Sequence, residues 1–353
     1  MREIKAEYIA QLDSKLAHAQ SIVIVTHAKP DGDAMGSCVG MFHALKLYGK
    51  RGTIVLANPA PDNLSFLTDG IENQTIIYER NSIGAAEAIS SGDLIICLDF
   101  NAFHRTDTLS EILKEAKGEK VLIDHHLNPD QEAFSLIFSK TDISSASELL
   151  YSILMMLPCV NGDASNLPIQ ASTALMTGMT TDTNNFANSV YPSTLSMAST
   201  LLAAGVDRDM IIRKIYNEFR ESRIRLMGHV LKDLMKITSD GVAYIILDQK
   251  TMYSYNVIEG DTEGFVNIPL SIDKVKMSIL IKEDKGMARV SIRSRKEISA
   301  NRCAREHFNG GGHENAAGGR LYFPTDIAGM EQAGEYIEAH THTFMTENYE
   351  TIK

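Results

Sequence analysis

Acidic and imidazole side chains recur in this sequence directly after short apolar runs. Three runs, 21–26, 93–98 and 120–123, are each followed by candidate ligands, and a fourth segment, 174–186, ends its apolar part in the same way. The residues are His27, Asp31 and Asp33; Asp99; Asp124, His125 and His126; and Asp182. In an open parallel sheet the carboxyl ends of strands meet at the edge where ligands bind. The sequence therefore predicts that four strand ends bring five carboxylates and three imidazoles together.

The clustering of these carboxylates points to cations. Carboxylates packed together repel one another and take up protons unless positive charge neutralises them. Oxygen and imidazole donors without thiolate suit Mn²⁺ or Mg²⁺, with Zn²⁺, Co²⁺ or Fe²⁺ as alternatives. The donors exceed the need of one ion, which favours two ions roughly 3.5–4 Å apart that share a carboxylate and activate water toward phosphorus. Asp31 and Asp33 alone are more typical of a turn or helix cap, so the recurrence at four places supports the metal site.

The apolar runs indicate which elements position these residues. They are continuous rather than alternating, which is typical of parallel strands covered on both faces. Runs at 21–26, 52–57, 93–98 and 120–124 are separated by helical patterns, such as 36–48, which Gly49 can terminate. This alternation predicts an α/β fold with a parallel sheet.

A second, smaller α/β unit is predicted after a helical stretch. The segment 192–238 shows three helical patterns and no strand signal. Strands follow at 242–248, 275–283 and 287–294, the last two joined by a tight turn at 284–286, and a long helix is expected at 325–346.

Composition limits the classes of partner. The chain has 353 residues, and 34 Lys and Arg against 45 Asp and Glu give a formal net charge of −11. This acidic balance argues against long duplex DNA and against an anionic membrane surface. The most apolar stretch, 149–160, is too short to span a bilayer. The four cysteines lie far apart without a Cys-x-x-Cys pair, which predicts buried cysteines and a cytoplasmic location.

These motifs resemble those of a known family. His27-x-x-x-Asp31-x-Asp33, the isolated Asp99, Asp124-His125-His126 and Asp182 resemble, in this order, the four signature motifs of the DHH phosphoesterases. Farther on, 310–313 reads Gly-Gly-Gly-His and 316–318 reads Ala-Ala-Gly, which resembles the DHHA1 domain of the same family. The resemblance implies a DHH catalytic domain over 1–192, a helical connector over 193–238 and a DHHA1 substrate-binding domain over 239–353. The architecture is most similar to the nano-RNases, which are bifunctional oligoribonucleases and 3′-phosphoadenosine 5′-phosphate (pAp) phosphatases.

The resemblance also implies roles for the site residues. One metal ion is expected on His27, Asp31 and Asp99, and the other on Asp33, Asp99, His125 and Asp182. His126 is expected beside the scissile phosphate, where an imidazole can orient substrate or protonate the leaving oxygen. Asp124 is expected to accept a hydrogen bond from a ligand imidazole or from the neighbouring backbone.

Candidate substrate contacts lie in the second unit. Consecutive glycines at Gly310, Gly311 and Gly312 let backbone N–H groups approach an anion, and His313 adds a donor. Arg293 lies on a predicted strand in a locally basic stretch, and its guanidinium can bind a phosphate through two hydrogen bonds. A glycine run alone is usually a turn, so the interpretation depends on the family context.

The expected function is a metal-dependent phosphoesterase that cleaves short oligonucleotides to mononucleotides and dephosphorylates pAp. Two divalent ions are expected, Mn²⁺ foremost, with Mg²⁺ or Co²⁺ as alternatives. A phosphodiesterase for cyclic di-AMP or linear dinucleotides is the first alternative, and a non-catalytic nucleotide sensor the second. The expected partners are short oligonucleotides or small nucleotide phosphates, and neither a membrane nor long duplex DNA is expected. A homodimer is possible on this reasoning.

Overall fold

The computed structural model describes residues 4–258 and 260–351. By its internal contacts the chain divides into two units, residues 1–218 and 219–353, and each unit is described by itself.

The first unit is built around a six-stranded, all-parallel sheet in the order β3-β2-β1-β4-β5-β6. Its strands are β1 (Ile22–Val25), β2 (Gly52–Leu56), β3 (Thr75–Ile77), β4 (Leu94–Leu98), β5 (Glu119–Asp124) and β6 (Leu136–Ser139). Ile22 of β1 lies opposite both Gly52 and Leu94. The strand order reverses at β1 and β4, which is where open α/β sheets bind ligands. The predicted parallel sheet is confirmed.

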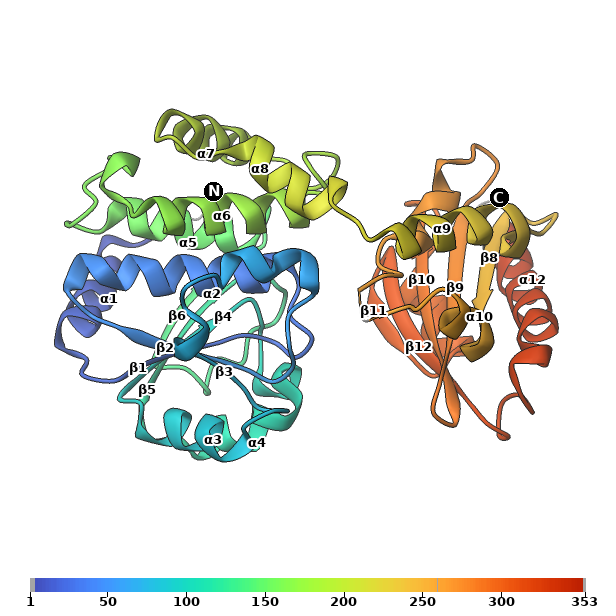
Figure 1. Ribbon diagram of the computed structural model, residues 1–353, viewed down its shortest axis with the longest axis horizontal. Helices are drawn as coiled ribbons and strands as arrows, with labels where there is room; N and C mark the ends of the chain where they lie inside the picture. Colours follow the sequence, from blue (N-terminus) through green and yellow to red (C-terminus); the bar gives the residue numbers. More distant parts are fainter. Residues whose placement is uncertain (1–3, 259, 352–353) are drawn as a thin grey trace. The chain divides into compact units, whose positions relative to one another are not determined.

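Helices cover both faces of this sheet (Figure 1). One face packs against α1 (Ala6–His18), α2 (Gly32–Ala44), α5 (Ala146–Met156) and α6 (Ile169–Asp182), and the other against α3 (Ser82–Ser91) and α4 (Ser110–Glu115). In β1, Ile22 and Ile24 join the first of these cores, and Val23 and Val25 join the second. Burial on both faces explains why the apolar runs are continuous.

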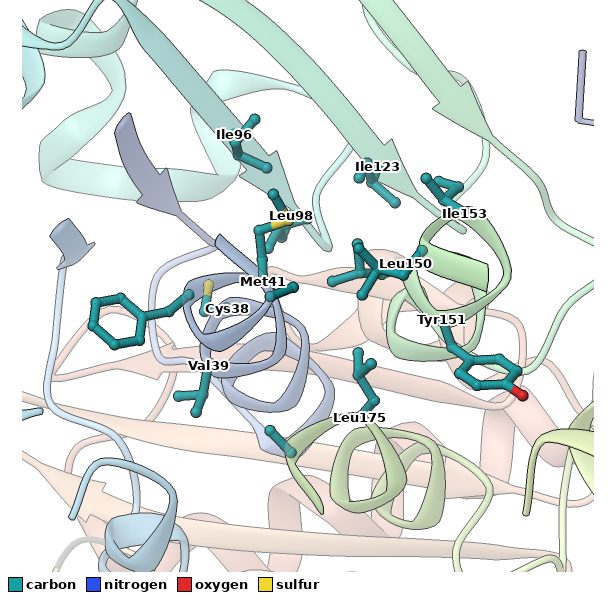
Figure 2. Close-up of a cluster of buried hydrophobic side chains, with 14 of the residues drawn as sticks. Cys38, Val39, Met41, Ile96, Leu98, Ile123, Leu150, Tyr151, Ile153 and Leu175 are labelled. Carbon is teal, nitrogen blue, oxygen red and sulfur yellow. The ribbon is translucent and has the colours of Figure 1, made fainter. Parts of the chain in front are cut away.

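The core on the α2 face brings three helices together (Figure 2). Met41 of α2, Leu150 of α5 and Leu175 of α6 are all buried in one cluster with residues of β4 and β5. Helices α2 and α6 approach so closely that a Cβ atom on Gly36 would lie 2.6 Å from the carbonyl oxygen of Ala174. This contact aligns the start of α2 with the end of α6.

The predicted helical stretch divides between the units. Helices α7 (Pro192–Ala203) and α8 (Arg208–Ile212), with the π-helical segment Arg213–Asn217 that continues α8, belong to the first unit, and α9 (Glu221–His229) belongs to the second. The three-part domain division therefore stays a prediction.

The second unit contains a mixed six-stranded sheet in the order β11-β12-β10-β9-β8-β7 (Figure 1). Its strands are β7 (Lys236–Ile237), β8 (Val242–Leu247), β9 (Met277–Asp284), β10 (Met287–Ser294), β11 (Gly311–His313) and β12 (Ala316–Tyr322). Helices α11 (Ala300–His307) and α12 (Ala333–Thr351) pack on one face. Helix α9 packs on part of the other face, near α10 (Gln249–Ser254). The predicted hairpin is present, and Gly286 adopts a φ of +70° in its turn.

Several local expectations were wrong. The segment before Asp182 is helix α6 rather than a strand, and α12 begins at Ala333 rather than near 325. Cys159 is exposed in the turn after α5, whereas the other three cysteines are buried. Within 4–258 and 260–351, no helix is both long and apolar enough to cross a membrane.

Candidate metal and phosphoester site

The structure brings the four sequence motifs to one edge of the first sheet. His27 follows β1, Asp99 follows the neighbouring β4, and His125 and His126 follow β5. Asp31 is the N-cap residue of α2, and its Oδ1 accepts hydrogen bonds from the backbone of Asp33 and Ala34. The helix-cap role and the site role of Asp31 therefore coexist.

Asp99 lies at the centre of the cluster. Its Oδ2 is 3.5 Å from Nε2 of His27, and its Oδ1 is 3.4 Å from Nε2 of His125. The side chain is 2% exposed, and Oδ1 has no hydrogen-bond partner among the described residues. Asp99 also has a φ of +62°, a left-handed conformation that is costly for a residue with a side chain and is typical of functional sites.

Two ligand-type groups meet at Asp99. His27, Asp31 and Asp99 offer donor atoms that all lie within 4.8 Å of one another, and so do Asp33, His125 and Asp182. The contact of His125 with Asp99 joins the second group to the first. The residues of the two expected sets, with Asp99 counted in both, therefore lie close together, and their assignment as metal ligands stays a prediction. A further group joins Asp99, His125 and His126.

Asp33 is fixed by the first turn of a helix that the sequence reasoning had not connected with the site. The backbone N–H of Ala146 donates to Oδ2 of Asp33 over 2.6 Å, and that of Ser147 donates to Oδ1 over 2.9 Å. Both carboxylate oxygens are thus held by the positive end of α5. The local signal was Ser145 followed by Glu148, because Ser145 caps α5 and accepts a hydrogen bond from the Glu148 backbone.

The imidazoles are oriented by their second ring nitrogens. Nδ1 of His27 donates to the carbonyl oxygen of Ala28 over 2.9 Å, which turns Nε2 toward the carboxylates. Metal-ligating histidines use this arrangement. Nδ1 of His126 donates to Oδ1 of Asp124 over 2.7 Å, so the partner of Asp124 is His126 rather than His125. Asp124 is fully buried.

The electrostatics of the cluster favour added positive charge. Burial, and then the charge of Asp99, raises the pKa of Asp33 to about 7. Burial, and then the charge of Asp33, raises the pKa of Asp182 to about 8. Burial alone would lower the pKa of His27, but the facing carboxylates outweigh it and raise that pKa to about 11. Protons are therefore retained where cations would otherwise lie.

These observations fit divalent ions. Oδ1 of Asp99 is buried and has no hydrogen-bond partner among the described residues, and Nε2 of His125 lies 3.4 Å from it. The donor atoms of the cluster are carboxylate oxygens and imidazole nitrogens. This donor set matches the preferences of Mn²⁺ and related ions.

The fourth motif ends in two asparagines. Just after Asp182 and Thr183, Asn184 has a φ of +46° and Asn185 a φ of +56°. Asparagine tolerates this left-handed conformation better than other residues with side chains. The backbone therefore turns here without glycine.

In the second unit, Arg293 and the glycine segment share one face of the sheet. Arg293 of β10 lies opposite Ala316 of β12, which lies opposite His313 of β11. Residues directly opposite one another project from the same face. Arg293 and His313 therefore flank the small side chain of Ala316. Burial lowers the pKa of Arg293.

The glycine segment is a strand edge rather than a loop. Gly311–His313 forms β11, and a Cβ atom on Gly310 would overlap the carbonyl oxygen of Gly318. The N–H of Gly312 donates to Oδ1 of Asn301, a residue that the sequence reasoning did not select. These glycines permit close backbone packing, and the Gly312 N–H is already engaged.

Comparison with known proteins agrees with the motifs and geometry. The family model described as "DHH family, N-terminal domain" matches residues 21–179, and the "DHHA1 domain" model matches residues 239–334. A bifunctional oligoribonuclease and PAP phosphatase NrnA from Thermus thermophilus is 30% identical over 304 residues, which are 85% of this chain and 84% of that protein. The chain belongs to the DHH family. It is accordingly a hydrolase of the phosphoesterase class.

Two other similar proteins differ in how much of their length this chain matches. The crystal structure of an exopolyphosphatase-related protein from Bacteroides fragilis is 37% identical, covers 99% of both chains and has a TM-score of 0.90. A cyclic-di-AMP phosphodiesterase GdpP from Geobacillus thermodenitrificans is 26% identical over 95% of this chain. This DHH-family chain spans only 50% of the length of that phosphodiesterase.

Proposed function

We propose that this protein hydrolyses short oligonucleotides to mononucleotides and also dephosphorylates pAp. The principal support is the position of Asp99, whose two carboxylate oxygens face separate histidines of two ligand-type groups. Similarity to an oligoribonuclease and PAP phosphatase over most of both chains supports the substrate class.

The site would hold two divalent ions, and Asp99 would be shared between them. The proposed ligands are His27, Asp31 and Asp99 for one ion and Asp33, Asp99, His125 and Asp182 for the other. When bound, such ions lower the pKa of an attacking water and neutralise charge on the phosphate. We propose Mn²⁺, with Mg²⁺ or Co²⁺ as alternatives, because oxygen and imidazole donors suit these ions.

His126 is the proposed proton donor for the leaving oxygen. Its Nδ1 is bonded to Asp124, so proton transfer to the substrate is assigned to Nε2. The buried Asp124 carboxylate would stabilise the imidazolium form and hold the ring in one orientation. This is the role that a buried aspartate has beside a catalytic histidine.

In the second unit, Arg293 and the segment Gly310–His313 are the proposed phosphate contacts. In the register of the sheet, the position between Arg293 and His313 carries the short side chain of Ala316. A phosphate bound there would lie between the guanidinium and the imidazole. An arginine provides a planar pair of donors for a phosphate.

The test is product analysis with purified protein and Mn²⁺. Di- to pentanucleotides should be converted to mononucleotides, and pAp to adenosine monophosphate and phosphate. If long RNA is consumed as fast as a dinucleotide, the assignment to short substrates is wrong. If the protein binds these nucleotides but hydrolyses none of them, even with Mn²⁺, it is a nucleotide sensor instead.

A second candidate is a phosphodiesterase for cyclic di-AMP or linear dinucleotides. The match of nearly the whole chain to GdpP favours it. The two candidates share the same metal site, so the motifs do not separate them. Rates on cyclic di-AMP, its linear dinucleotide and pAp, measured side by side, would do so.

A further inference from the structure

Three basic side chains lie in one row across the second sheet. Arg289 of β10 is opposite Lys282 of β9 and opposite Arg320 of β12. Like charges placed directly opposite on one face destabilise a sheet. Among the residues that the structure describes, only Arg289 of the three is within ion-pair distance of an acidic side chain, that of Asp284. We call Lys282, Arg289 and Arg320 the basic row.

The basic row shares its sheet face with Arg293. Residues 289, 291 and 293 alternate along β10 and therefore project from the same face. The row and Arg293 are about 13 Å apart along the strand, at the usual rise per residue. Between them, Ser291 lies opposite Gly318 of β12, which lies opposite Gly311, and on its other side Ser291 lies opposite the buried Leu280 of β9. The β12 and β11 side of this stretch presents almost no side chains, so a sugar-phosphate chain can cross it there.

A cavity of about 340 Å³ borders the basic row. Its lining includes Lys282 and Arg289 of the row together with Met252, Tyr253 and Ile258. The Tyr253 side chain is 86% exposed, an unusual position for an aromatic ring with no burial to stabilise it. Proteins that bind single-stranded nucleic acids combine basic side chains with exposed aromatic rings on which bases stack.

The acidic residues of this cavity are already engaged. The carboxylate of Glu283 accepts a hydrogen bond from the backbone of Gln249 over 2.7 Å. Asp284 is paired with Arg289 and also accepts a hydrogen bond from the backbone of Lys285. Their negative charge is therefore partly offset, and Lys282 and Arg320 remain available to a phosphate.

We infer that the basic row and Tyr253 form a second nucleotide subsite on this unit. The basic row binds a phosphate of a short single-stranded oligonucleotide, and Tyr253 stacks on a base of the same strand. The inference rests on the proposed function, because Arg293 is taken to hold another phosphate of that strand. Substrates of several nucleotides use the subsite, whereas pAp is too short to reach it from Arg293.

The double variant Arg289→Ala/Arg320→Ala tests the subsite in the full chain. We expect the dissociation constant of a fluorescently labelled hexanucleotide, measured by anisotropy in EDTA so that no cleavage occurs, to rise roughly tenfold. The slope of log Kd against log salt should fall by about 0.7 for each phosphate that the variant no longer neutralises. Hydrolysis of pAp with Mn²⁺ should stay within about twofold of wild type, because pAp does not occupy the row.

Two further variants complete the experiment. Tyr253→Ala removes an exposed ring and should weaken hexanucleotide binding about fivefold or more without changing the salt slope. Arg225→Ala is the matched control, because Arg225 is an exposed arginine on α9 that is paired with Glu221 and lies outside the sheet. The Arg225→Ala protein should bind the hexanucleotide with the same affinity as wild type.

The outcomes separate the two claims. An unchanged hexanucleotide affinity and salt slope in the double variant would overturn the subsite, and so would an equal loss of pAp hydrolysis and hexanucleotide binding. If the wild-type protein cleaves no oligonucleotide but binds the hexanucleotide in a row-dependent manner, the subsite stands and the proposed function fails.

Discussion

The Nδ1 nitrogen of His126 donates a hydrogen bond to Oδ1 of the buried Asp124 over 2.7 Å. The preceding residue, His125, instead directs its Nε2 toward Asp33, Asp99 and Asp182. Two adjacent histidines at the end of β5 are therefore placed for different tasks. The first faces the ligand cluster, and the second is paired with a carboxylate that can stabilise its charged form.

Replacing Asp124 by Asn should separate these tasks. Asp124→Asn removes the negative charge that stabilises protonated His126, so kcat on a trinucleotide should fall on the order of a hundredfold. The affinity for Mn²⁺, measured by calorimetry, should change little because His125 and Asp99 are untouched. The His126→Gln variant should have a kcat as low as that of Asp124→Asn, because it removes the proton donor itself. An Asp124→Asn enzyme with wild-type kcat, or one that loses metal affinity as strongly as kcat, would contradict this account.

The glycine contact between α2 and α6 should be intolerant of a methyl group. In Gly36→Ala, the new Cβ would lie 2.6–2.7 Å from backbone atoms of Ala174 and Gly178, so the helices must separate. We expect the free energy of unfolding to fall by about 1–3 kcal/mol in urea titrations. Gly228→Ala is the control, because a Cβ atom there meets nothing within 4 Å. Equal stability of the Gly36→Ala protein and wild type would show that the packing is looser than described.

His43 should make the stability of the protein depend on pH. Burial, and then the charge of Lys46, lowers the pKa of this 5% exposed histidine to about 4. The unfolded chain binds a proton near pH 6.5 and the folded chain does not, so stability is fully present above pH 6.5 and falls as pH drops toward 4. His43→Leu should therefore lose less stability than wild type between pH 7 and pH 5.

Urea midpoints at pH 7 and pH 5, measured in EDTA, check the His43 prediction. Because the other titrating groups are common to both proteins, the difference between the two pH dependences isolates His43. Parallel pH dependences of the variant and wild type would mean that His43 titrates alike in the folded and unfolded chains.

Local sequence patterns were sufficient for the centre of the first sheet. The runs that became β1, β4 and β5 are continuously apolar because both of their faces are covered, and the candidate ligands follow them directly. The edge strands β3 and β6 were not predicted: β3 has only three residues, and neither strand is buried along its whole length as the equally short β1 is. Strands β11 and β12 are rich in glycine and small residues, which are depleted in strands.

Contacts between distant segments could not be predicted in this way. Asp33 is held by the N–H groups of Ala146 and Ser147, more than 110 residues away in the chain. Asp182 reaches the cluster from the end of α6, and the close packing of Gly36 against α6 places that end beside the start of α2. Such contacts depend on tertiary packing, which no single-sequence periodicity contains.

The most direct test of the proposed chemistry is the Asp99→Ala variant assayed with a trinucleotide and Mn²⁺. Asp69→Ala, which removes an exposed aspartate far along the chain from the motifs, is the matched control. Because Asp99 faces His27 of one group and His125 of the other and is the proposed shared ligand, mononucleotide release should fall by about a thousandfold or more, whereas the control should be unaffected. Release by Asp99→Ala at the wild-type rate would contradict the account.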